Sequence, residues 1–369
     1  MRTQKVDVIR IPMHGPGDVS GLIGLLDSER VRAQDIVAVL AKTEGNGCVN
    51  DYTREYTTFA MATALSPYLK ATPRDVEAKI AFVMSGGTEG VLSPHATVFA
   101  RREVERARPR GKRLAVGIGF TREFLPEEIG RTIQAVETAA AVQSAMRDAA
   151  IAGAEDVHFV QIKCPLLTSE RVEAAKQRGR TTATEDAYVS MAYSRGASAL
   201  GVALALGEIA GPPADEQILR DWKLYSSVAS MSAGIEVMRN LVIVMGNSEA
   251  AASECVIGHS VMRDAIDLQS VLRAFSSVGI DAAGGLQPDS AGRVVNVFAK
   301  AEAAPNGLVR GLRHTMLDDS DINSTRHARA AVGGLIAGVS GCGAIYVSGG
   351  AEHQGPPGGG PVAVIARAD

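Results

Sequence analysis

The sequence predicts an α/β fold made of three similar units. Three short apolar runs each end in a lysine, each lysine is followed by an arginine in a polar context, and each arginine is followed by a glycine turn that begins with a serine. Short apolar runs between turn residues are typical of buried strands, and longer amphipathic stretches are typical of helices. Alternating strands and helices give an α/β architecture, and the threefold recurrence indicates pseudo-threefold symmetry.

The lysine-ended runs are expected to be strands. They cover residues 36–42, 157–163 and 294–300 and end at Lys42, Lys163 and Lys300. A single lysine at a strand end is usually solvated, so one such run would carry little weight. Three runs with the same polar partners in the same order are harder to explain by folding, which needs repeated apolar faces but not repeated lysines.

Each unit also carries the pattern serine, small residue, glycine, any residue, glutamate. The three turns begin at Ser85, Ser232 and Ser348. Strand-like runs at 80–84 and 344–347 precede the first and third turns, so these two serines are expected where a strand meets a glycine turn. A last strand is expected at 362–365.

The arginines lie between the lysines and the serines, in contexts typical of helix starts. They are Arg54, Arg195 and Arg326. Amphipathic periodicity predicts the helices, at 55–69, 126–149, 187–209 and 324–338.

The interval from lysine to serine is longest in the middle unit, which therefore contains an insertion. Most of this insertion is a charged helical segment at 168–180 and a polar linker at 181–186. Seams are expected at 106–113 and 248–256. They divide the chain into repeat units 1–104, 113–250 and 256–367.

Composition excludes several functional classes. The 369 residues include 38 lysines and arginines and 41 acidic residues, for a net charge of −3, and only 4% are aromatic. A nucleic-acid binder would show a basic face or stacking aromatics, so no nucleic-acid partner is expected. No apolar run reaches the roughly 18–20 residues of a membrane span. Four scattered cysteines without a CxxC pair suit a reducing compartment, and we expect a cytoplasmic protein.

Familiar catalytic motifs are absent from the sequence. It contains no GxSxG, HExxH, Walker A or complete GxGxxG pattern, and its seven histidines form no metal-ligand spacing. The recurring lysine, arginine and serine are therefore the best candidates for chemistry. Gathered around one axis, they would line a pocket for a small, flat ligand with several carbonyl oxygens, because arginine recognises planar acceptors and serine turns can form an oxyanion hole.

A serine–lysine pair can catalyse acyl transfer when the lysine is neutral and takes the serine proton. A nearby carboxylate opposes this by favouring the charged lysine. Lys42 has Glu44 two residues later and Lys300 has Glu302 at the same offset, whereas Lys163 has Pro165 there. We therefore predict that Lys163 and Ser232 react and that the outer pairs, Lys42 with Ser85 and Lys300 with Ser348, mainly bind the ligand.

Four segments of the chain resemble the cyanuric acid hydrolase and barbiturase family, and the resemblance spans essentially the whole sequence. They are KTEGNGCVNDYTR (42–54), MSGGTEGVLSPH (84–95), YSRGAS (193–198) and VSGGAEHQGP (347–356). Within the family, the sequence is most similar to the bacterial enzymes of s-triazine (atrazine) degradation. The resemblance implies a barrel-like core with outer helices, formed by three similar domains, and a homotetramer.

The resemblance also implies an activity and a set of functional residues. A serine attacks a carbonyl of cyanuric acid, water releases carboxybiuret, and this product decarboxylates to biuret. Lys163 and Ser232 match the family's base and nucleophile. The residues that match its substrate-binding positions are Arg54, Ser85, Gly86, Arg195, Ser232, Ala233, Arg326, Ser348 and Gly349.

The resemblance further implies a structural divalent cation near the C-terminus and no cofactor for catalysis. The matching positions are Glu302 and the oxygens of Ala351, Gln354, Gly355, Pro356 and Gly359. One carboxylate with several carbonyls suits Mg²⁺ or Ca²⁺. The alternative is that the proline- and glycine-rich segment 356–360 is only a flexible connection to the last strand.

Two alternative functions stay open at this point. A barbiturase would act on a ring with CH₂ in place of one N–H, which the sequence does not distinguish from first principles. A non-catalytic sensor would bind a small ring or anion with the same arginines and turns, but it would not need lysines at the ends of buried strands.

Overall fold

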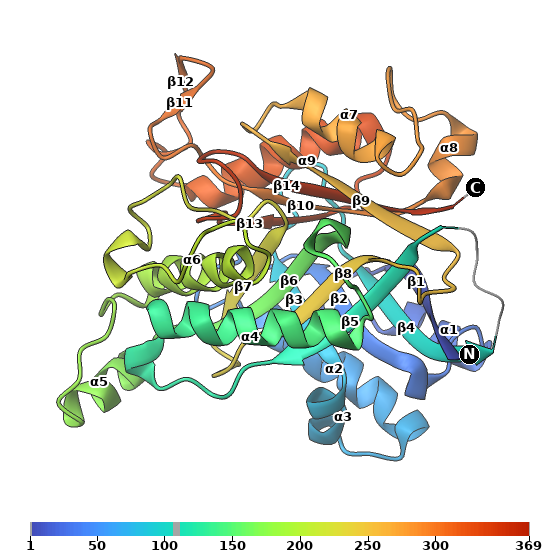
Figure 1. The fold of residues 1–369 in the computed structure, drawn as a ribbon, viewed down its shortest axis with the longest axis horizontal. Coiled ribbons are helices and arrows are strands. Elements are labelled where there is room, and N and C mark those ends of the chain that lie inside the picture. The colour runs from blue at the N-terminus through green and yellow to red at the C-terminus, as the bar shows by residue number, and fades with distance from the viewer. Residues whose placement is uncertain (1, 106–110, 369) are drawn as a thin grey trace.

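The computed structural model describes residues 2–105 and 111–368, which form an α/β structure with three four-stranded sheets (Figure 1). The predicted seam at 106–113 lies mainly outside the described residues, because residues 106–110 are among those left out. The seam predicted at 248–256 falls between the end of one sheet and the start of the next, at Ser248 and Cys255.

Each sheet is formed by one continuous part of the chain. The first contains β1 (Arg2–Pro12), β2 (Ile36–Thr43), β3 (Ala81–Gly86) and β4 (His95–Glu105). The second contains β5 (Arg113–Phe120), β6 (Val157–Pro165), β7 (Ala229–Gly234) and β8 (Leu241–Ser248). The third contains β9 (Cys255–Met262), β10 (Val294–Ala301), β13 (Tyr346–Gly349) and β14 (Gly360–Arg367). A short hairpin consists of β11 (Leu308–Val309) and β12 (Leu312–Arg313).

The three sheets share one strand order and one pattern of strand directions. The orders are β1-β4-β2-β3, β5-β8-β6-β7 and β9-β14-β10-β13. In each sheet the second strand of this order runs antiparallel to the strands on both sides. The third and fourth strands of the order, such as β2 and β3, run parallel to each other. The division into repeat domains stays a prediction, but the boundaries of the sheets agree with the predicted units to within two residues, with β4 ending at Glu105 and β9 beginning at Cys255.

The parallel pairs place each lysine beside its serine. Lys42 pairs in register with Ser85, Lys163 with Ser232, and Lys300 with Ser348. Side chains at paired positions of neighbouring strands point to the same face of the sheet. The common topology therefore brings each lysine and serine together, although they are far apart in sequence.

Helices cover the outer faces of the sheets. They are α1 (Ser20–Asp27), α2 (Tyr52–Leu69), α3 (Pro73–Lys79), α4 (Thr132–Asp148), α5 (Ser169–Gln177), α6 (Ala187–Ala205), α7 (Leu268–Ser276), α8 (Pro288–Arg293) and α9 (Ser324–Ser340). The helices at 55–69 and 324–338 are confirmed as α2 and α9, and the helix at 187–209 is confirmed as α6 except that it ends four residues earlier, at Ala205. The helix expected at 126–149 begins later, because Gly130 has a φ of 80° that interrupts it before Thr132.

The three helices that carry the arginines start in the same way. Asp51 accepts a hydrogen bond from the Thr53 N–H at the start of α2, and Asp186 accepts one from the Val189 N–H at the start of α6. Asn323 caps α9 through the Thr325 N–H. Such caps satisfy backbone donors that have no partner within the helix, so they fix where each helix begins.

The inner faces of the three sheets meet in a shared apolar core. Phe298 lies at its centre, with its ring centroid 6.4 Å from that of Phe99, 5.5 Å from Phe159 and 5.6 Å from Tyr346. In the part of the chain that the structure describes, strand pairing does not close the sheets into one barrel. The predicted barrel-like core is corrected to three separate sheets whose packed side chains, rather than a continuous ladder, hold the centre together.

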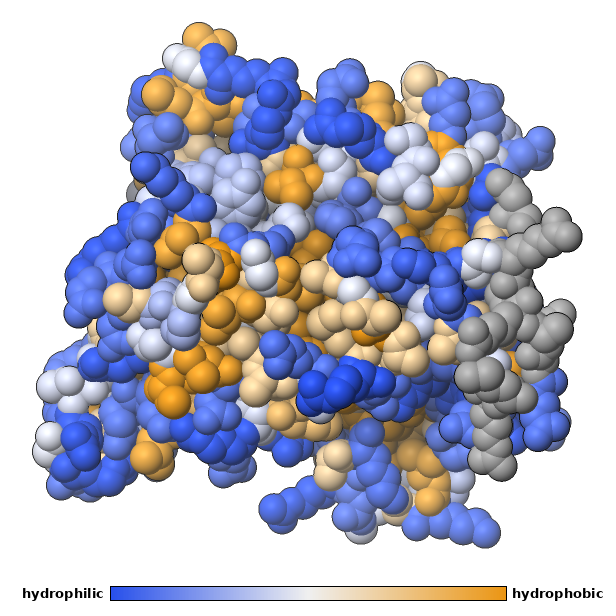
Figure 2. Space-filling model, viewed as in Figure 1, coloured by the Kyte–Doolittle hydropathy of each residue, from blue (hydrophilic) through white to orange (hydrophobic). Residues whose placement is uncertain are grey.

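The surface shown in Figure 2 mixes polar and apolar residues, with apolar ones gathered near the middle of the face, where α4 and α6 run. Val136 on α4 and Val189 on α6 are among the exposed large apolar residues. Within residues 2–105 and 111–368, no helix is long and apolar enough to cross a membrane.

Candidate active site

A small cavity unites the recurring residues of the three sheets. Most of its lining comes from the serine turns and from arginines of the three capped helices. The lining residues are Gly47, Arg54, Ser85, Gly86, Met191, Arg195, Ser232, Ala233, Arg329, Ser348 and Gly349. All three predicted serines and the small residues that follow them therefore lie around one space. Two of the three predicted arginines, Arg54 and Arg195, also lie there.

Lys42 and Lys300 bind their serines directly. The Lys42 amine donates to Ser85 Oγ at 3.1 Å and to the Gly86 carbonyl at 3.2 Å. The Lys300 amine donates to Ser348 Oγ at 3.2 Å and also to backbone carbonyls. Both side chains are fully buried, so these two lysines hold the serine turns in place from behind the cavity.

Lys163 has a different partner from the other two lysines. Its amine forms an ion pair of 2.6 Å with Glu236, and it donates to the Met84 carbonyl at 3.3 Å. Ser232 Oγ donates to the same carbonyl at 3.4 Å. The side chains of Lys163 and Ser232 therefore meet at one backbone oxygen rather than at each other.

The carboxylate argument made from sequence holds for Lys300, whose pKa Glu302 raises, but fails for the other two lysines. Glu44 is exposed and is not among the charges that shift the pKa of Lys42, and Lys163 is the lysine that directly contacts a carboxylate. In every unit the carboxylate with the largest effect on the lysine is the glutamate that ends the turn pattern, at Glu89, Glu236 and Glu352. These glutamates were visible in the motif, but their partners depend on how the sheets meet.

Burial lowers the pKa of all three lysines, because an apolar surrounding disfavours the charged amine. The Arg329 charge lowers the pKa of Lys42 further, and burial with the Arg195 charge lowers the pKa of Lys300 to about 7. For Lys163, the Glu236 charge raises the pKa and so opposes the effect of burial. Burial alone would raise the pKa of Glu236, but the charges of Lys163 and Arg54 lower it to about 2, so this carboxylate stays ionised at neutral pH.

The arginines of the cavity are held by carboxylates or carbonyls. Arg195 donates two hydrogen bonds to Glu352, at 2.7 and 2.6 Å. Arg54 donates to the carbonyls of Ala233 and Cys48. Among the described residues, its Nε is buried with no hydrogen-bond partner. A buried donor without a partner is costly, so this nitrogen is suited to a ligand acceptor.

The third arginine in the cavity is Arg329, not the predicted Arg326. Arg329 is buried and donates to both oxygens of Glu89, whereas the Arg326 side chain is 41% exposed, also contacts Glu89, and does not line the cavity. Both lie on α9, one turn apart and therefore on the same side of the helix. The polar helix start singled out Arg326, and only the packing of α9 against the first unit reveals Arg329.

The residues proposed for the cation lie in one buried part of the third unit. Burial and the neighbouring Glu352 charge raise the pKa of Glu302 above its usual range. The side chain of Gln354 is already used, because its oxygen accepts from the Met231 N–H and its nitrogen donates to backbone carbonyls. No group of three or more His, Cys, Asp and Glu side chains suited to a metal occurs among residues 2–105 and 111–368.

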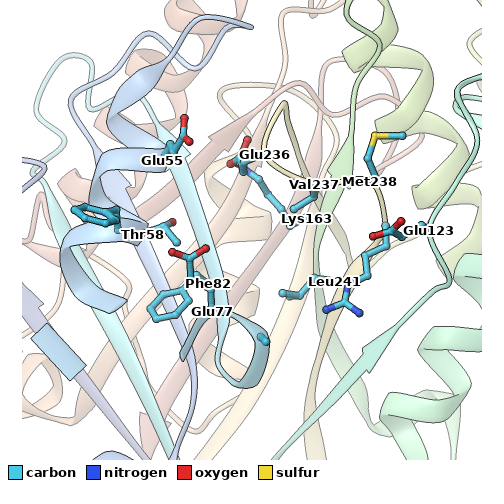
Figure 3. A pocket seen from close by; sticks show the side chains of 13 residues that line it. Glu55, Thr58, Glu77, Phe82, Glu123, Lys163, Glu236, Val237, Met238 and Leu241 are labelled. Atoms are coloured by element: carbon cyan, nitrogen blue, oxygen red, sulfur yellow. Dashed lines mark ion pairs between the residues drawn. The ribbon is translucent and has the colours of Figure 1, made fainter. Parts of the chain in front are cut away.

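A larger cavity of about 550 Å³ lies between the first and second units (Figure 3). Its lining comes from α2, α3 and the segment after the Ser232 turn, and includes Glu55, Thr58, Phe59, Glu77, Ala78, Phe82, Glu123, Lys163, Glu236, Val237, Met238, Arg239 and Leu241. Lys163 and Glu236 lie side by side at its wall (Figure 3). Lys42 and Lys300 do not line it.

The sequence matches, over residues 7–367, the model of a family described as amidohydrolase ring-opening protein. This chain belongs to the ring-opening amidohydrolase family. It is 65% identical to a cyanuric acid amidohydrolase of Bradyrhizobium diazoefficiens over 100% of this chain and 99% of the relative. It is 62% identical to a cyanuric acid amidohydrolase of Pseudomonas sp. (strain ADP) over 98% of this chain and 99% of the relative.

Solved structures of this family have the same fold. One, described as cyanuric acid hydrolase and as an evolutionary innovation by structural concatenation, matches with a TM-score of 0.95 and 61% identity over 99% of this chain and 100% of its own. A cyanuric acid hydrolase from A. caulinodans matches with a TM-score of 0.90 and 47% identity over 99% of each chain. As a ring-opening amidohydrolase, the protein is an enzyme that hydrolyses a cyclic amide.

Proposed function

We propose that the protein opens the ring of cyanuric acid by hydrolysis to carboxybiuret, which loses carbon dioxide to give biuret. One observation carries the proposal: three serines from the three sheets and three arginines from α2, α6 and α9 line a single cavity. The relatives described as cyanuric acid amidohydrolases support the same substrate. Three similar units around a pseudo-threefold axis, as the sequence predicts, would offer equivalent donors around the ligand.

The cavity suits a flat ring with three carbonyl oxygens. The lysines donate to Ser85 and Ser348, so the hydroxyl hydrogens of these serines are free to point to a ligand oxygen. The unpartnered Nε of Arg54 adds a donor. Substrate binding would then satisfy polar groups that are otherwise buried without partners, which favours the ring that presents the matching acceptors.

We assign Ser232 as the nucleophile and Lys163 as the general base. Ser232 Oγ attacks a ring carbonyl carbon, and its proton passes to a neutral Lys163 amine. The ring C–N bond breaks as Lys163 returns the proton to the leaving nitrogen. Water then attacks the acyl-serine carbonyl, Lys163 takes the water proton and gives it to Ser232 Oγ, and carboxybiuret leaves.

Two features support the middle pair over the outer pairs. Ser232 is the most exposed of the three serines, at 7% against 4% for Ser85 and 2% for Ser348. Its Oγ is bound to a backbone carbonyl at a long 3.4 Å rather than to a lysine, so it is freer to turn toward a substrate. Catalytic hydrogen bonds are often loose before substrate binds and tighten in the complex.

A structural Mg²⁺ or Ca²⁺ is part of the same proposal. The residues present fit a hard cation, because the buried Glu302 has another carboxylate, Glu352, close enough to raise its pKa, and a cation would relieve that repulsion. Glu302 and the carbonyl oxygens of residues 351–359 would hold it. Such an ion would fix the loop that positions Arg195 through Glu352. The homotetramer stays a prediction.

The decisive experiment measures biuret and carbon dioxide from cyanuric acid, with barbituric acid in parallel. We expect turnover of cyanuric acid, and a loss of about 10²- to 10⁴-fold in kcat in Lys163→Met, which removes the base but keeps an apolar side chain of similar length. Turnover of barbituric acid alone would show that barbituric acid, and not cyanuric acid, is the substrate. No turnover of either ring would leave the serine–arginine cavity as a binding site and contradict the proposal.

A further inference from the structure

The glutamates that end the three turn patterns differ in what they bind. Glu89 accepts from Arg329 and Glu352 accepts from Arg195, so each of these carboxylates is paired with an arginine from another unit. Glu236 instead pairs with the lysine of its own unit. Equivalent positions of one repeated motif therefore serve two different purposes.

The hydrogen bonds of Arg54 explain why Glu236 pairs with Lys163 rather than with an arginine. Arg54 is the arginine that the first unit contributes to the cavity, but its terminal nitrogens donate to the carbonyls of Ala233 and Cys48 rather than to Glu236. It still lies close enough for its charge to lower the pKa of both Lys163 and Glu236. Glu236 is thus free to bind the Lys163 amine at 2.6 Å.

Ser232, Lys163 and Glu236 are neighbours in this order. Ser232 and Lys163 are paired neighbours in the β6–β7 ladder and both donate to the Met84 carbonyl, while Glu236 contacts the Lys163 amine. A nucleophile, a base and a third group that orients the base is the arrangement found in many acyl-transfer enzymes. The outer lysines lack the third group, because their glutamates are committed to arginines.

We propose that Glu236 is a positioning residue that completes a Ser232–Lys163–Glu236 chain, in which its carboxylate holds the Lys163 amine where it can take the Ser232 proton. This inference rests on the proposed function, because it acts through the base assigned there. The carboxylate also stabilises the charged amine that forms when Ser232 loses its proton to Lys163.

The larger cavity gives this chain contact with water. The Glu236 side chain is 20% exposed and lines that cavity together with Lys163. The other charged groups around the pair are Arg54 and Arg171, and farther along the cavity wall Glu55, Glu77, Glu123 and Arg239. The Arg54 charge lowers the pKa of Lys163, whereas the charge of Glu236 raises it. The base can therefore exchange protons with water from this side, away from the serines.

Steady-state kinetics of Glu236→Gln across pH tests the inference. Glutamine has nearly the same shape but no charge, so we expect kcat to fall by about 10²-fold, within the contribution of positioned acid–base groups. The KM for cyanuric acid should change little, because Glu236 does not line the serine–arginine cavity. The acid limb of the kcat profile should move to lower pH, because the lost carboxylate no longer raises the pKa of Lys163.

A matched control is Glu123→Gln, which removes a carboxylate from the wall of the same cavity but is not among the groups that shift Lys163. We expect wild-type kcat and an unmoved acid limb for this control. If Glu236→Gln kept wild-type kcat and the same acid limb, Glu236 would have no role through Lys163. If Glu236→Gln does not fold, Glu236→Asp keeps the charge but withdraws it from the Lys163 amine, so kcat should fall while KM stays near wild type, and wild-type kcat in this variant would contradict the inference. Failure of the proposed function itself would appear separately, as no turnover of cyanuric acid by the wild-type protein, and failure of the base assignment as full activity in Lys163→Met.

Discussion

The middle unit and the two outer units contain the same sheet but use their lysines differently. In the outer units the lysine is fully buried and binds its serine, and the nearby glutamate binds an arginine. In the middle unit the lysine binds the glutamate and lines a cavity, and within the described residues the serine hydroxyl is bound to the Met84 carbonyl rather than to a lysine. Three sheets with the same topology can thus place their lysines, serines and glutamates in different contacts.

The difference comes from the contacts between units rather than from the strands. Lysine and serine occupy paired positions in all three ladders. The arginine from the neighbouring unit decides whether the glutamate is available, because a bidentate arginine pair is strong and geometrically demanding. Where Arg54 binds backbone carbonyls instead, the glutamate turns to Lys163.

Serine substitutions test this comparison with the largest expected effect. Ser232→Ala should lower kcat by about 10⁴-fold or more, as expected when a nucleophile is removed. Ser348→Ala should cost about tenfold, mostly in KM, because it removes one hydrogen bond to the ligand. Both are measured by biuret release. The reverse order, with Ser348 or Ser85 essential and Ser232 dispensable, would move the nucleophile to an outer unit and break the assignment.

Arginine substitutions on α9 sharpen the comparison with an intermediate effect. Arg329→Lys should lower kcat/KM by about 10²-fold, because lysine cannot reproduce two hydrogen bonds to a buried carboxylate. Arg326→Lys, one turn away and facing the same Glu89, should cost no more than about threefold, as expected for an exposed ion pair. Equal losses in the two variants would mean that Arg326 also reaches the substrate.

Much of the fold was predictable because local signals agree with it. The strands expected at 36–42, 157–163 and 294–300 are confirmed as β2, β6 and β10, each within two residues at its end. The strand at 362–365 is confirmed as the inner part of β14. Long apolar runs identify such strands whatever their neighbours are. The central strands β4 and β8 carried no motif and were not predicted, although each pairs with two others.

The site was predictable only in part. Repetition singled out the three serines, which the structure brings to one cavity, and it singled out Arg54 and Arg195. It did not reveal Arg329, whose role depends on a second unit, nor the partner of Glu236. The offset from Lys300 to Glu302 does supply a charge that raises the pKa of the lysine, but the larger effects come from turns and helices, such as Glu89 and Arg329 on Lys42, which the offsets along one strand do not reveal.

Substitutions of the small residues after the serines should have the smallest effects on the protein. The contacts of these residues also explain why the outer units have glycine where the middle unit has Ala233. A Cβ on Gly86 would overlap the Asp51 carboxylate, and a Cβ on Gly349 would overlap Thr325 and approach Arg329. Asp51 caps the helix that carries Arg54. Gly86→Ala should therefore destabilise the protein by about 1–3 kcal/mol, the range for overpacking a close contact, measured as the free energy of unfolding in urea.

Ala233, at the equivalent position of the middle unit, already accommodates a methyl group. It is 2% exposed and belongs to the apolar core of its unit, so its methyl fills space rather than blocking a carboxylate. Ala233→Gly should cost only about 0.5–1 kcal/mol, mainly from the greater freedom of glycine in the unfolded chain. Its KM for cyanuric acid should stay close to wild type if the methyl is structural. A change of tenfold or more would instead make this methyl a determinant of ring selectivity, present in the one unit whose serine we assign as the nucleophile.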